Sequence, residues 1–214
     1  MAKNKAMKEL FVFPYNGNAL EAIDCITNDY KLIGFIDDDK EKQGVQQNGY
    51  EVFSRDILIK YPDVQILAVP GSPETYLRRK DIIESLNIAP HRFAVIIHPR
   101  STISSLAKIG YNTLIMAGAV VTSNAVIGNH VCILPNSVIH HDVDIGEFCL
   151  IGSKVSVASH VKIGRNCYIG SGSNIINNIN IGENTLVGIG SNVIASLPAN
   201  IKAVGNPARK IGII

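Results

Sequence analysis

The sequence predicts an α/β domain followed by an all-β parallel β-helix, and two observations support this fold class. Strand-like and helix-like segments alternate up to about residue 100, and from Ser101 onward the chain repeats every six residues. Written in sixes from Ser101, sixteen rows in succession carry Ile or Val in the third place, from Ile103 to Val193. A period of six is typical of a β-helix, in which each row forms one short strand and a turn.

The first hundred residues predict a Rossmann-like domain, which we place at 1–99. Apolar runs predict strands at 9–15, 31–39, 64–71 and 92–99, and helical spacing predicts helices near 19–26, 54–61 and 72–86. Ser54 and Ser72 are expected to cap the last two helices, with Pro73 in the first helical position. Strands that alternate with helices indicate a parallel sheet with both faces covered.

The six-residue rows predict a triangular solenoid at 100–196, followed by a C-terminal extension at 197–214. Three rows make one coil, so the sixteen rows form about five coils stabilised by contacts between neighbours. The Ile/Val column is expected to point inward, and the small or β-branched residues of the first place are expected to fill the corners. Eight rows carry Gly in the fourth place, where we expect it to permit a tight turn.

Composition excludes several classes of function. The net charge is +2 with no basic stripe, which argues against a dedicated nucleic-acid binder. No apolar run approaches the roughly 18 residues of a membrane span, so we expect a soluble, cytoplasmic protein. The four cysteines form no CxxC pair and are expected to be free and buried. Residues 101–214 carry 7 Lys/Arg against 4 Asp/Glu, a weak positive bias that suits an anionic ligand.

The stretch SVIHHDVDIGEF at 137–148 holds the best candidate for a catalytic group. His140 and His141 follow the inward-pointing Ile139, so at least one of them should face outward at a corner. Imidazole titrates close to neutral pH and serves as a general base when a carboxylate orients it, a role open to Asp142 or Asp144. The alternative is a pair of solvated corner histidines. Residues 18 apart stack in neighbouring coils, so His141 shares a column with Ser123, Ser159 and Asn177.

Two cofactor classes are not expected. Catalytic zinc takes three protein ligands, yet the solenoid histidines His130, His140, His141 and His160 contain no HxxxxH pair. Asp37 lies 20 residues after Gly17, a spacing typical of dinucleotide folds. The turn FPYNGNALE lacks the glycines of GxGxxG, however, so NAD is excluded.

The rows, together with LPANIKAVGNPARKIG at 197–212, resemble the hexapeptide-repeat acyltransferases. The N-terminal strands, the GFIDDDK element and the junction IIHPRSTIS resemble the sialic-acid O-acetyltransferase-like subfamily, which includes N-acetyltransferases of nucleotide-linked amino sugars. The resemblance implies a left-handed β-helix, acetyl-CoA as co-substrate without a metal, and a homotrimer with active sites between subunits.

The resemblance also implies roles for individual residues. His141 is the base and Asp142 its supporting acid, whereas His140 has no assigned role. Ser159, where relatives commonly carry Gly, is expected to offer its backbone amide to the acetyl carbonyl. The implied acetyl-CoA contacts also include Lys162, Arg165, Arg209 and Lys210, and the implied nucleotide-sugar contacts are Gly17, Asn18, Asp37, Asp38 and Lys40. Leu150 stands where many relatives have a second histidine.

The expected reaction is direct transfer of acetyl from acetyl-CoA to the amino group of a nucleotide-linked amino sugar, of the UDP, GDP or dTDP type, for bacterial glycans. Two alternatives remain open. One is O-acetylation of sialic acid or another sugar, and the other is a non-catalytic solenoid that binds a nucleotide sugar.

Overall fold

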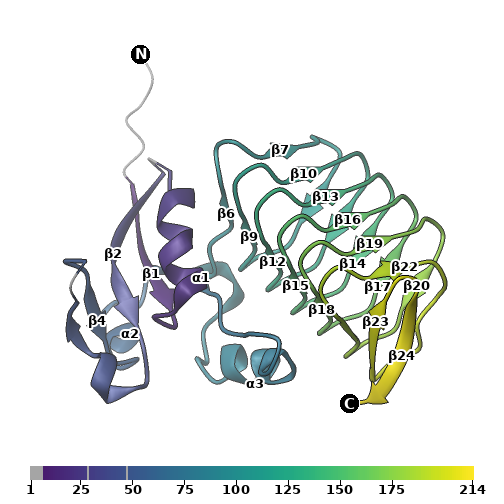
Figure 1. The fold of residues 1–214 in the computed structure, drawn as a ribbon. Coiled ribbons are helices and arrows are strands. Elements are labelled where there is room, and N and C mark those ends of the chain that lie inside the picture. Colours follow the sequence, from purple (N-terminus) through teal and green to yellow (C-terminus); the bar gives the residue numbers. More distant parts are fainter. Residues whose placement is uncertain (1–6, 28, 47) are drawn as a thin grey trace.

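The computed structural model describes residues 7–27, 29–46 and 48–214. An N-terminal α/β domain lies beside a triangular parallel β-helix (Figure 1). Within the described ranges, no helix combines the length and the apolar character that crossing a bilayer requires.

The N-terminal sheet has five strands in the order β3-β4-β2-β1-β5. Its bounds are β1 Lys8–Phe13, β2 Tyr30–Ile36, β3 Gly44–Val45, β4 Glu51–Phe53 and β5 Gln65–Ala68. β1 pairs in parallel with both β2 and β5, and β2 pairs in parallel with β4, so only the short β3 runs antiparallel. The alternation of strands and helices therefore predicted the parallel core, whereas β3 and β4 were not expected.

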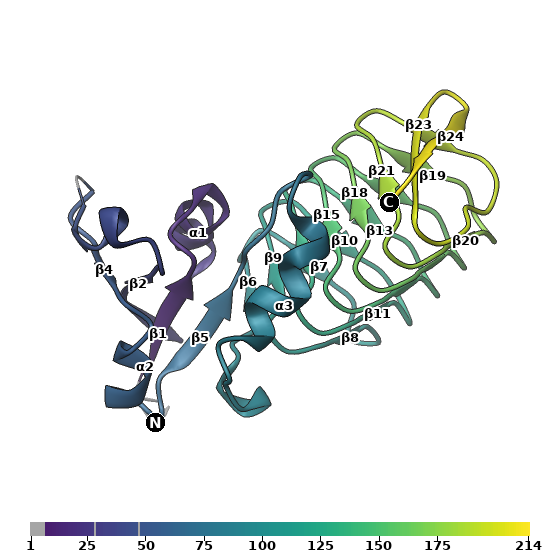
Figure 2. The ribbon, with the colours of Figure 1, turned by 90° about the horizontal axis from the view of Figure 1, so that it is seen from below.

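Both faces of this sheet are covered, as a parallel sheet requires. Leu10 and Val12 of β1 pack in one cluster with the helix α1 (Gly17–Ala22). Phe11 and Phe13, which alternate with them, pack in a second cluster with α2 (Ile57–Lys60) and α3 (Arg79–Glu84). Figure 2 shows α1 and α2 on different sides of β1.

The predicted serine caps are wrong. α1 is capped by Asn16, whose Oδ1 accepts from the Ala19 amide at 2.9 Å, and a 3-10 turn at Ile23–Cys25 follows it. α2 begins at Ile57, and no side-chain hydrogen bond caps it. The Ser72 hydroxyl accepts from the Glu74 amide at 3.3 Å, which closes a local turn instead of starting a helix. The helical segment therefore starts later, with a 3-10 turn at Tyr76–Arg78 that leads into α3.

The last strand predicted for the N-terminal domain belongs mostly to the β-helix. Phe93 forms only an isolated bridge with Ile66 of β5. β6 (Ile96–Ile97) pairs instead in parallel with β9, in the β-helix. Ile97 lies six residues before Ile103, so the repeat starts one row earlier than predicted.

The β-helix has three faces, each a parallel ladder of two-residue strands until the C-terminal hairpin. Face I turns toward the N-terminal domain and continues from β6 through β9 Leu114–Ile115, β12 Cys132–Ile133, β15 Leu150–Ile151, β18 Tyr168–Ile169 and β21 Leu186–Val187 to the hairpin β23 Ile201–Gly205 and β24 Ala208–Ile213. Face II comprises β7 Thr102–Ile103, β10 Val120–Val121, β13 Val138–Ile139, β16 Ser156–Val157, β19 Asn174–Ile175 and β22 Asn192–Val193. Face III comprises β8 Lys108–Ile109, β11 Val126–Ile127, β14 Asp144–Ile145, β17 Lys162–Ile163 and β20 Asn180–Ile181.

The inward Ile/Val column is confirmed. Its members from Ile115 to Val193 are buried in one cluster, and only Ile103 and Ile109, in the first coil, are partly exposed. First-place side chains close the corners by donating to backbone carbonyls, as when the Ser137 hydroxyl donates to the Gly152 carbonyl at 2.7 Å. The four cysteines are free and buried, as expected.

The fourth-place glycines have a different purpose from the one predicted. The positive φ angles fall in the sixth place of the rows from Asn112 to Gly190, for example 60° at Asn124 and 59° at Asp142. A Cβ at Gly146 would lie 2.6 Å from the Arg165 backbone nitrogen, in the next coil. Glycine in the fourth place therefore allows neighbouring coils to approach closely, whereas the turn is formed two residues later, mostly by Asn, Asp, His or Gly but also by Phe148 and Lys154.

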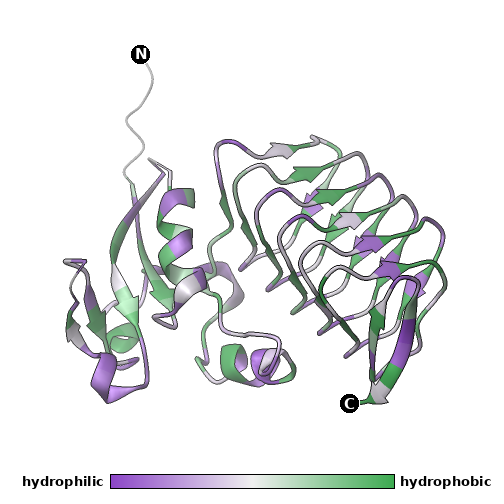
Figure 3. Cartoon of the chain, in the orientation of Figure 1, coloured by the Kyte–Doolittle hydropathy of each residue, from purple (hydrophilic) through white to green (hydrophobic). Residues whose placement is uncertain are grey.

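Face I is the surface that packs on the N-terminal domain, and Figure 3 shows hydrophobic strands along it. Leu114 and Cys132 share a buried cluster with Leu10 and Val12 of β1. At the edge of this junction Arg79 is fully buried, and its guanidinium donates to the His130 carbonyl at 2.8 Å and to the Pro70 carbonyl. The two domains are thus joined by polar as well as apolar contacts.

His130 is enclosed by aromatic rings at the same junction. Its ring stacks on Phe148 at 4.5 Å and meets Phe93 and Tyr111 edge-on. Asn112, held by the backbone of Ala68, lies with its Nδ2 2.9 Å from His130 Nδ1. Burial, with a smaller contribution from the Arg79 charge, lowers the pKa of His130 to about 4.

Candidate active site

The segment 140–143 forms the corner between β13 of face II and β14 of face III. His140 and His141 are both exposed there, so the hexad frame correctly predicted an outward-facing histidine. The corner is fixed by backbone bonds to both neighbouring coils, because the Asp142 amide donates to the Ser123 carbonyl at 3.0 Å and the His160 amide donates to the His141 carbonyl at 3.2 Å.

His141 and Asp142 form a hydrogen-bonded pair. His141 Nδ1 lies 2.7 Å from Asp142 Oδ2, and Asn124 Nδ2 donates to Asp142 Oδ1 at 3.0 Å. These two bonds, with the nearby imidazoles of His160 and His141, lower the pKa of Asp142 and keep it ionised at neutral pH. Of the two acids considered, the structure brings Asp142 to His141, whereas Asp144 lies on face III in register with Lys162.

The sequence analysis missed His160 as a neighbour of this pair. The His160 ring lies perpendicular to the His141 ring, with centroids 5.2 Å apart. Donor atoms of His141, Asp142 and His160 all lie within 4.8 Å of one another, close enough to be considered as metal ligands. The signal was in the spacing, because His160 follows Asp142 by one full coil of 18 residues.

Ser159 stacks on His141 in the next coil, as the column predicted. Its carbonyl accepts from the Asn178 amide at 3.1 Å. No acceptor among the residues that the structure describes bonds the Ser159 amide, so this N–H is available to a bound carbonyl oxygen.

The predicted acetyl-CoA cations do not gather in one place on a single chain. Lys162 is exposed on face III, and Arg165 follows at the corner between faces III and I, where its Nε lies 2.7 Å from Glu183. Arg209 and Lys210 are exposed on β24, at the end of face I. A ligand that reached all four would have to cross more than one face of the β-helix.

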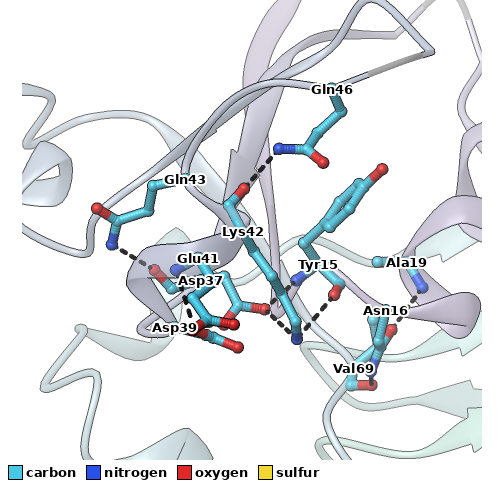
Figure 4. Close-up of polar contacts among 10 residues, drawn as sticks. All are labelled: Tyr15, Asn16, Ala19, Asp37, Asp39, Glu41, Lys42, Gln43, Gln46 and Val69. Carbon is cyan, nitrogen blue, oxygen red and sulfur yellow. Dashed lines mark hydrogen bonds and ion pairs between the residues drawn. The ribbon is translucent and has the colours of Figure 1, made fainter.

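Asp37 is buried and organises the predicted nucleotide turn. Figure 4 shows its contacts. Its carboxylate accepts from the Tyr15 amide at 3.0 Å and the Asp39 amide at 2.9 Å, and it pairs with Lys42 at 3.2 Å. Lys42, which was not among the predicted residues, is therefore the lysine that contacts Asp37. Asp37 thus ties the end of β2 to the end of β1.

The other predicted substrate residues surround this turn. Gly17 begins α1, and exposed Lys40 begins a 3-10 turn at Lys40–Lys42. Exposed Asp38 pairs with Arg55, whose Nε donates to Asp38 Oδ1 at 2.6 Å. Asn18 reaches a cavity between the two domains.

This interdomain cavity has a volume of ≈ 190 Å³ and is mainly apolar. From the N-terminal domain it is lined by Asn18 and by the loop at 71–73, and from the β-helix by Leu134, Leu150 and Tyr168. Leu150 thus contributes an apolar wall. The sequence analysis missed the loop and Tyr168, because only the docking of the two domains brings them together.

The cavity and the His141 pair lie on different parts of the β-helix. The cavity opens on face I and on the corner that follows β12 and β15, between faces I and II. His141 occupies the corner between faces II and III. On a triangular prism these are different corners, so one chain does not bring them together.

Comparison with known proteins matches the repeat region to a family. Residues 106–141 and 142–177 match the family described as bacterial transferase hexapeptide (six repeats). No curated protein sequence matches the chain. The matched repeats lie within the three parallel ladders, an arrangement consistent with the predicted left-handed β-helix.

Solved structures extend this likeness over nearly the whole chain. The acetyltransferase domain of PglB from Neisseria gonorrhoeae FA1090 is 25% identical with a TM-score of 0.83, over 95% of this chain and 100% of that one. Its complex with acetyl coenzyme A is 24% identical with a TM-score of 0.84, over 96% and 100%. PerB from Caulobacter crescentus, in complex with CoA and GDP-perosamine, is 22% identical with a TM-score of 0.83, over 97% and 99%. The predicted resemblance to hexapeptide-repeat acyltransferases is therefore confirmed.

Proposed function

We propose that the chain is an acetyl-CoA-dependent N-acetyltransferase that acts in the cytoplasm on the amino group of a nucleotide-linked amino sugar, for bacterial glycan biosynthesis. The observation that supports this most is the His141–Asp142 pair, 2.7 Å apart at an exposed corner of a coil. It occurs in a chain that shares its fold with an acetyltransferase crystallised with acetyl coenzyme A.

The proposed reaction needs one base and no covalent enzyme intermediate. The sugar amine attacks the thioester carbonyl carbon, a C–N bond forms, and the carbonyl oxygen becomes an oxyanion. His141 Nε2 takes the proton that the amine loses, while Asp142 holds Nδ1 and stabilises the imidazolium. The C–S bond then breaks, and the CoA thiolate leaves and takes up the proton.

The amide of Ser159 is the proposed donor to the oxyanion. It lies one coil from His141 in the same column and has no acceptor among the described residues. A backbone N–H held in place by the β-helix costs little reorganisation when the negative charge develops. Because the donor is a backbone group, the side chain at position 159 is free to vary.

We further propose a homotrimer in which each active site is built from two copies. The Rossmann-like N-terminal domain, 1–99, would hold the nucleotide through Gly17, Asn18, Asp38 and Lys40, with Asp37 shaping the turn. The left-handed β-helix, 100–196, of a second copy would supply His141. The location of His141 on a different corner from the interdomain cavity supports this arrangement.

A second copy also accounts for the scattered cations. We place acetyl-CoA along the groove between two β-helices, where Lys162 and Arg165 of one copy can approach Arg209 and Lys210 of the C-terminal extension, 197–214, of the other. The phosphate groups of acetyl-CoA need several cationic partners, and these four side chains are solvent-exposed.

The decisive experiment follows thiol release from acetyl-CoA with a panel of UDP-, GDP- and dTDP-4-amino sugars, with free sialic acid as the hydroxyl acceptor. Release with an amino sugar that stops in His141→Ala supports the proposal. Release only with sialic acid favours O-acetylation. Binding of a nucleotide sugar without any release favours the non-catalytic solenoid.

A further inference from the structure

Three metal-ligating side chains project from one corner of two adjacent coils. His141 and Asp142 come from the corner after β13, and His160 comes from the corner after β16. Their donor atoms lie within 4.8 Å of one another, and all three side chains are exposed. The proposed acetyl transfer assigns no role to His160.

The repeat itself aligns these groups. Asp142 and His160 both occupy the sixth place of a row, with φ of 59° and 62°, so the same turn geometry directs both side chains away from the same edge. The bond from the His160 amide to the His141 carbonyl, at 3.2 Å, fixes the two corners against each other. The backbone is thus held in position, and only side-chain rotation remains free.

We propose that His141, Asp142 and His160 bind a transition-metal ion, Zn²⁺ above all, and that this ion inhibits the enzyme by occupying its base. Two imidazoles and one carboxylate form a common zinc ligand set that leaves a position open for water. The donor atoms lie within 4.8 Å of one another, and exposed side chains can rotate to place each donor about 2.0–2.2 Å from one ion. Asn124, bonded to Asp142 Oδ1, supports the ligand carboxylate from outside.

The ligand spacing explains why the sequence analysis did not expect a metal. The HxxxxH spacing joins histidines within one short segment. His141 and His160 are instead 19 residues apart, and they meet because one coil takes 18 residues. The consequence is chemical competition. Zn²⁺ bound at Nε2 of His141 occupies the lone pair that would accept the amine proton, and Zn²⁺ bound at Nδ1 leaves the ring proton on Nε2.

The binding experiment is independent of catalysis. Zn²⁺ is titrated calorimetrically into the full chain with any affinity tag removed, and Co²⁺ is followed by its visible absorption. We expect about one site per chain in the wild type and in the control His91→Asn, which removes an exposed histidine outside the cluster. His160→Asn and Asp142→Asn should each weaken Zn²⁺ binding more than tenfold. Equal affinity in all four proteins would overturn the proposal.

The inhibition experiment rests on the proposed function. Each protein is compared with itself, with and without Zn²⁺, in the thiol-release assay. The wild type and His91→Asn should lose activity reversibly and regain it with a chelator, whereas His160→Asn should resist a tenfold higher Zn²⁺ concentration. Inhibition at the same concentration in His160→Asn would contradict an inhibitory site. If no acceptor supports acetyl transfer, only the proposed function fails, and the binding titration still decides the metal site.

Discussion

Asp142 is held from two sides, by His141 and by Asn124, and these bonds fix the orientation of its carboxylate. The two bonds lower the pKa of Asp142, so its carboxylate carries its charge at neutral pH. Because the carboxylate meets Nδ1, the proposed general base is the other ring nitrogen, Nε2.

We expect His141→Ala to lower kcat by about 10²–10⁴-fold, the usual contribution of a positioned general base. The side chain is exposed, so the melting temperature should change little. Initial rates of CoA release measure the effect, with His140→Ala as the matched control on the neighbouring exposed histidine. Comparable losses in the two variants would contradict the assignment of His141.

His130 makes a separate prediction about stability. Its folded pKa of about 4 lies below the ordinary 6.5, so between these values the unfolded chain binds a proton that the folded chain does not. The free energy of unfolding should therefore fall as the pH drops from 6.5 to 4, by on the order of 2 kcal/mol. Urea unfolding at several pH values measures this slope. His130→Phe should reduce the dependence of the unfolding free energy on pH, and His91→Asn should not. An unchanged dependence in His130→Phe would refute the assignment to His130.

At the level of elements, neighbouring coils pack closely against each other, and the fourth-place glycines allow this close approach of their backbones. Gly146→Ala places a methyl group 2.6 Å from the Arg165 nitrogen. We expect a destabilisation of about 1–3 kcal/mol, the usual cost of overpacking.

The matched control is Gly212→Ala in β24, where no atom lies within 4 Å of the added Cβ and the φ angle is not positive. Thermal unfolding of both variants provides the comparison. A loss of stability in Gly212→Ala as large as in Gly146→Ala would show that close approach between coils is not the cause.

The elements also show which parts of the fold were predictable. A strict period placed the inward column and the two histidines, because every row repeats the same backbone. The helix starts predicted at Ser54 and Ser72 were wrong, because short local turns compete with helix capping and leave no distinct sequence pattern. The contact of Lys42 with Asp37 was not predicted, because it depends on how a 3-10 turn orients its side chains.

At the scale of the whole molecule, the candidate site could be predicted only within one segment. His141 and Asp142 are neighbours in sequence, so their pairing was accessible. The interdomain cavity was not, because Asn18, Leu150 and Tyr168 meet only after face I docks on the N-terminal domain. The same docking buries Arg79 without a carboxylate partner among the described residues, an arrangement that no sequence pattern indicates.

A site shared between copies predicts complementation. Asn18→Phe should block the interdomain cavity and His141→Ala should remove the base, so each variant alone should be inactive. Co-expressed in equal amounts, they should recover about a quarter of the wild-type rate, because random assembly joins an intact cavity to an intact corner at one interface in four. Thiol release from the purified mixed oligomer tests this, and no recovery would indicate a site within one chain.

The left-handed turn of the sixth place also decides which acids this corner tolerates. Asp142 stands where the backbone already favours Asn or Asp, and Asn124 fills the same place one coil earlier. A chain can therefore gain or lose the charge at this corner by exchanging two side chains of nearly identical shape, with no demand on the fold. A longer acid, Glu, lacks the local hydrogen bonds that favour this conformation and would cost about 1 kcal/mol. The charge at this corner can therefore change while the turn, which the solenoid repeats in every coil, keeps its conformation.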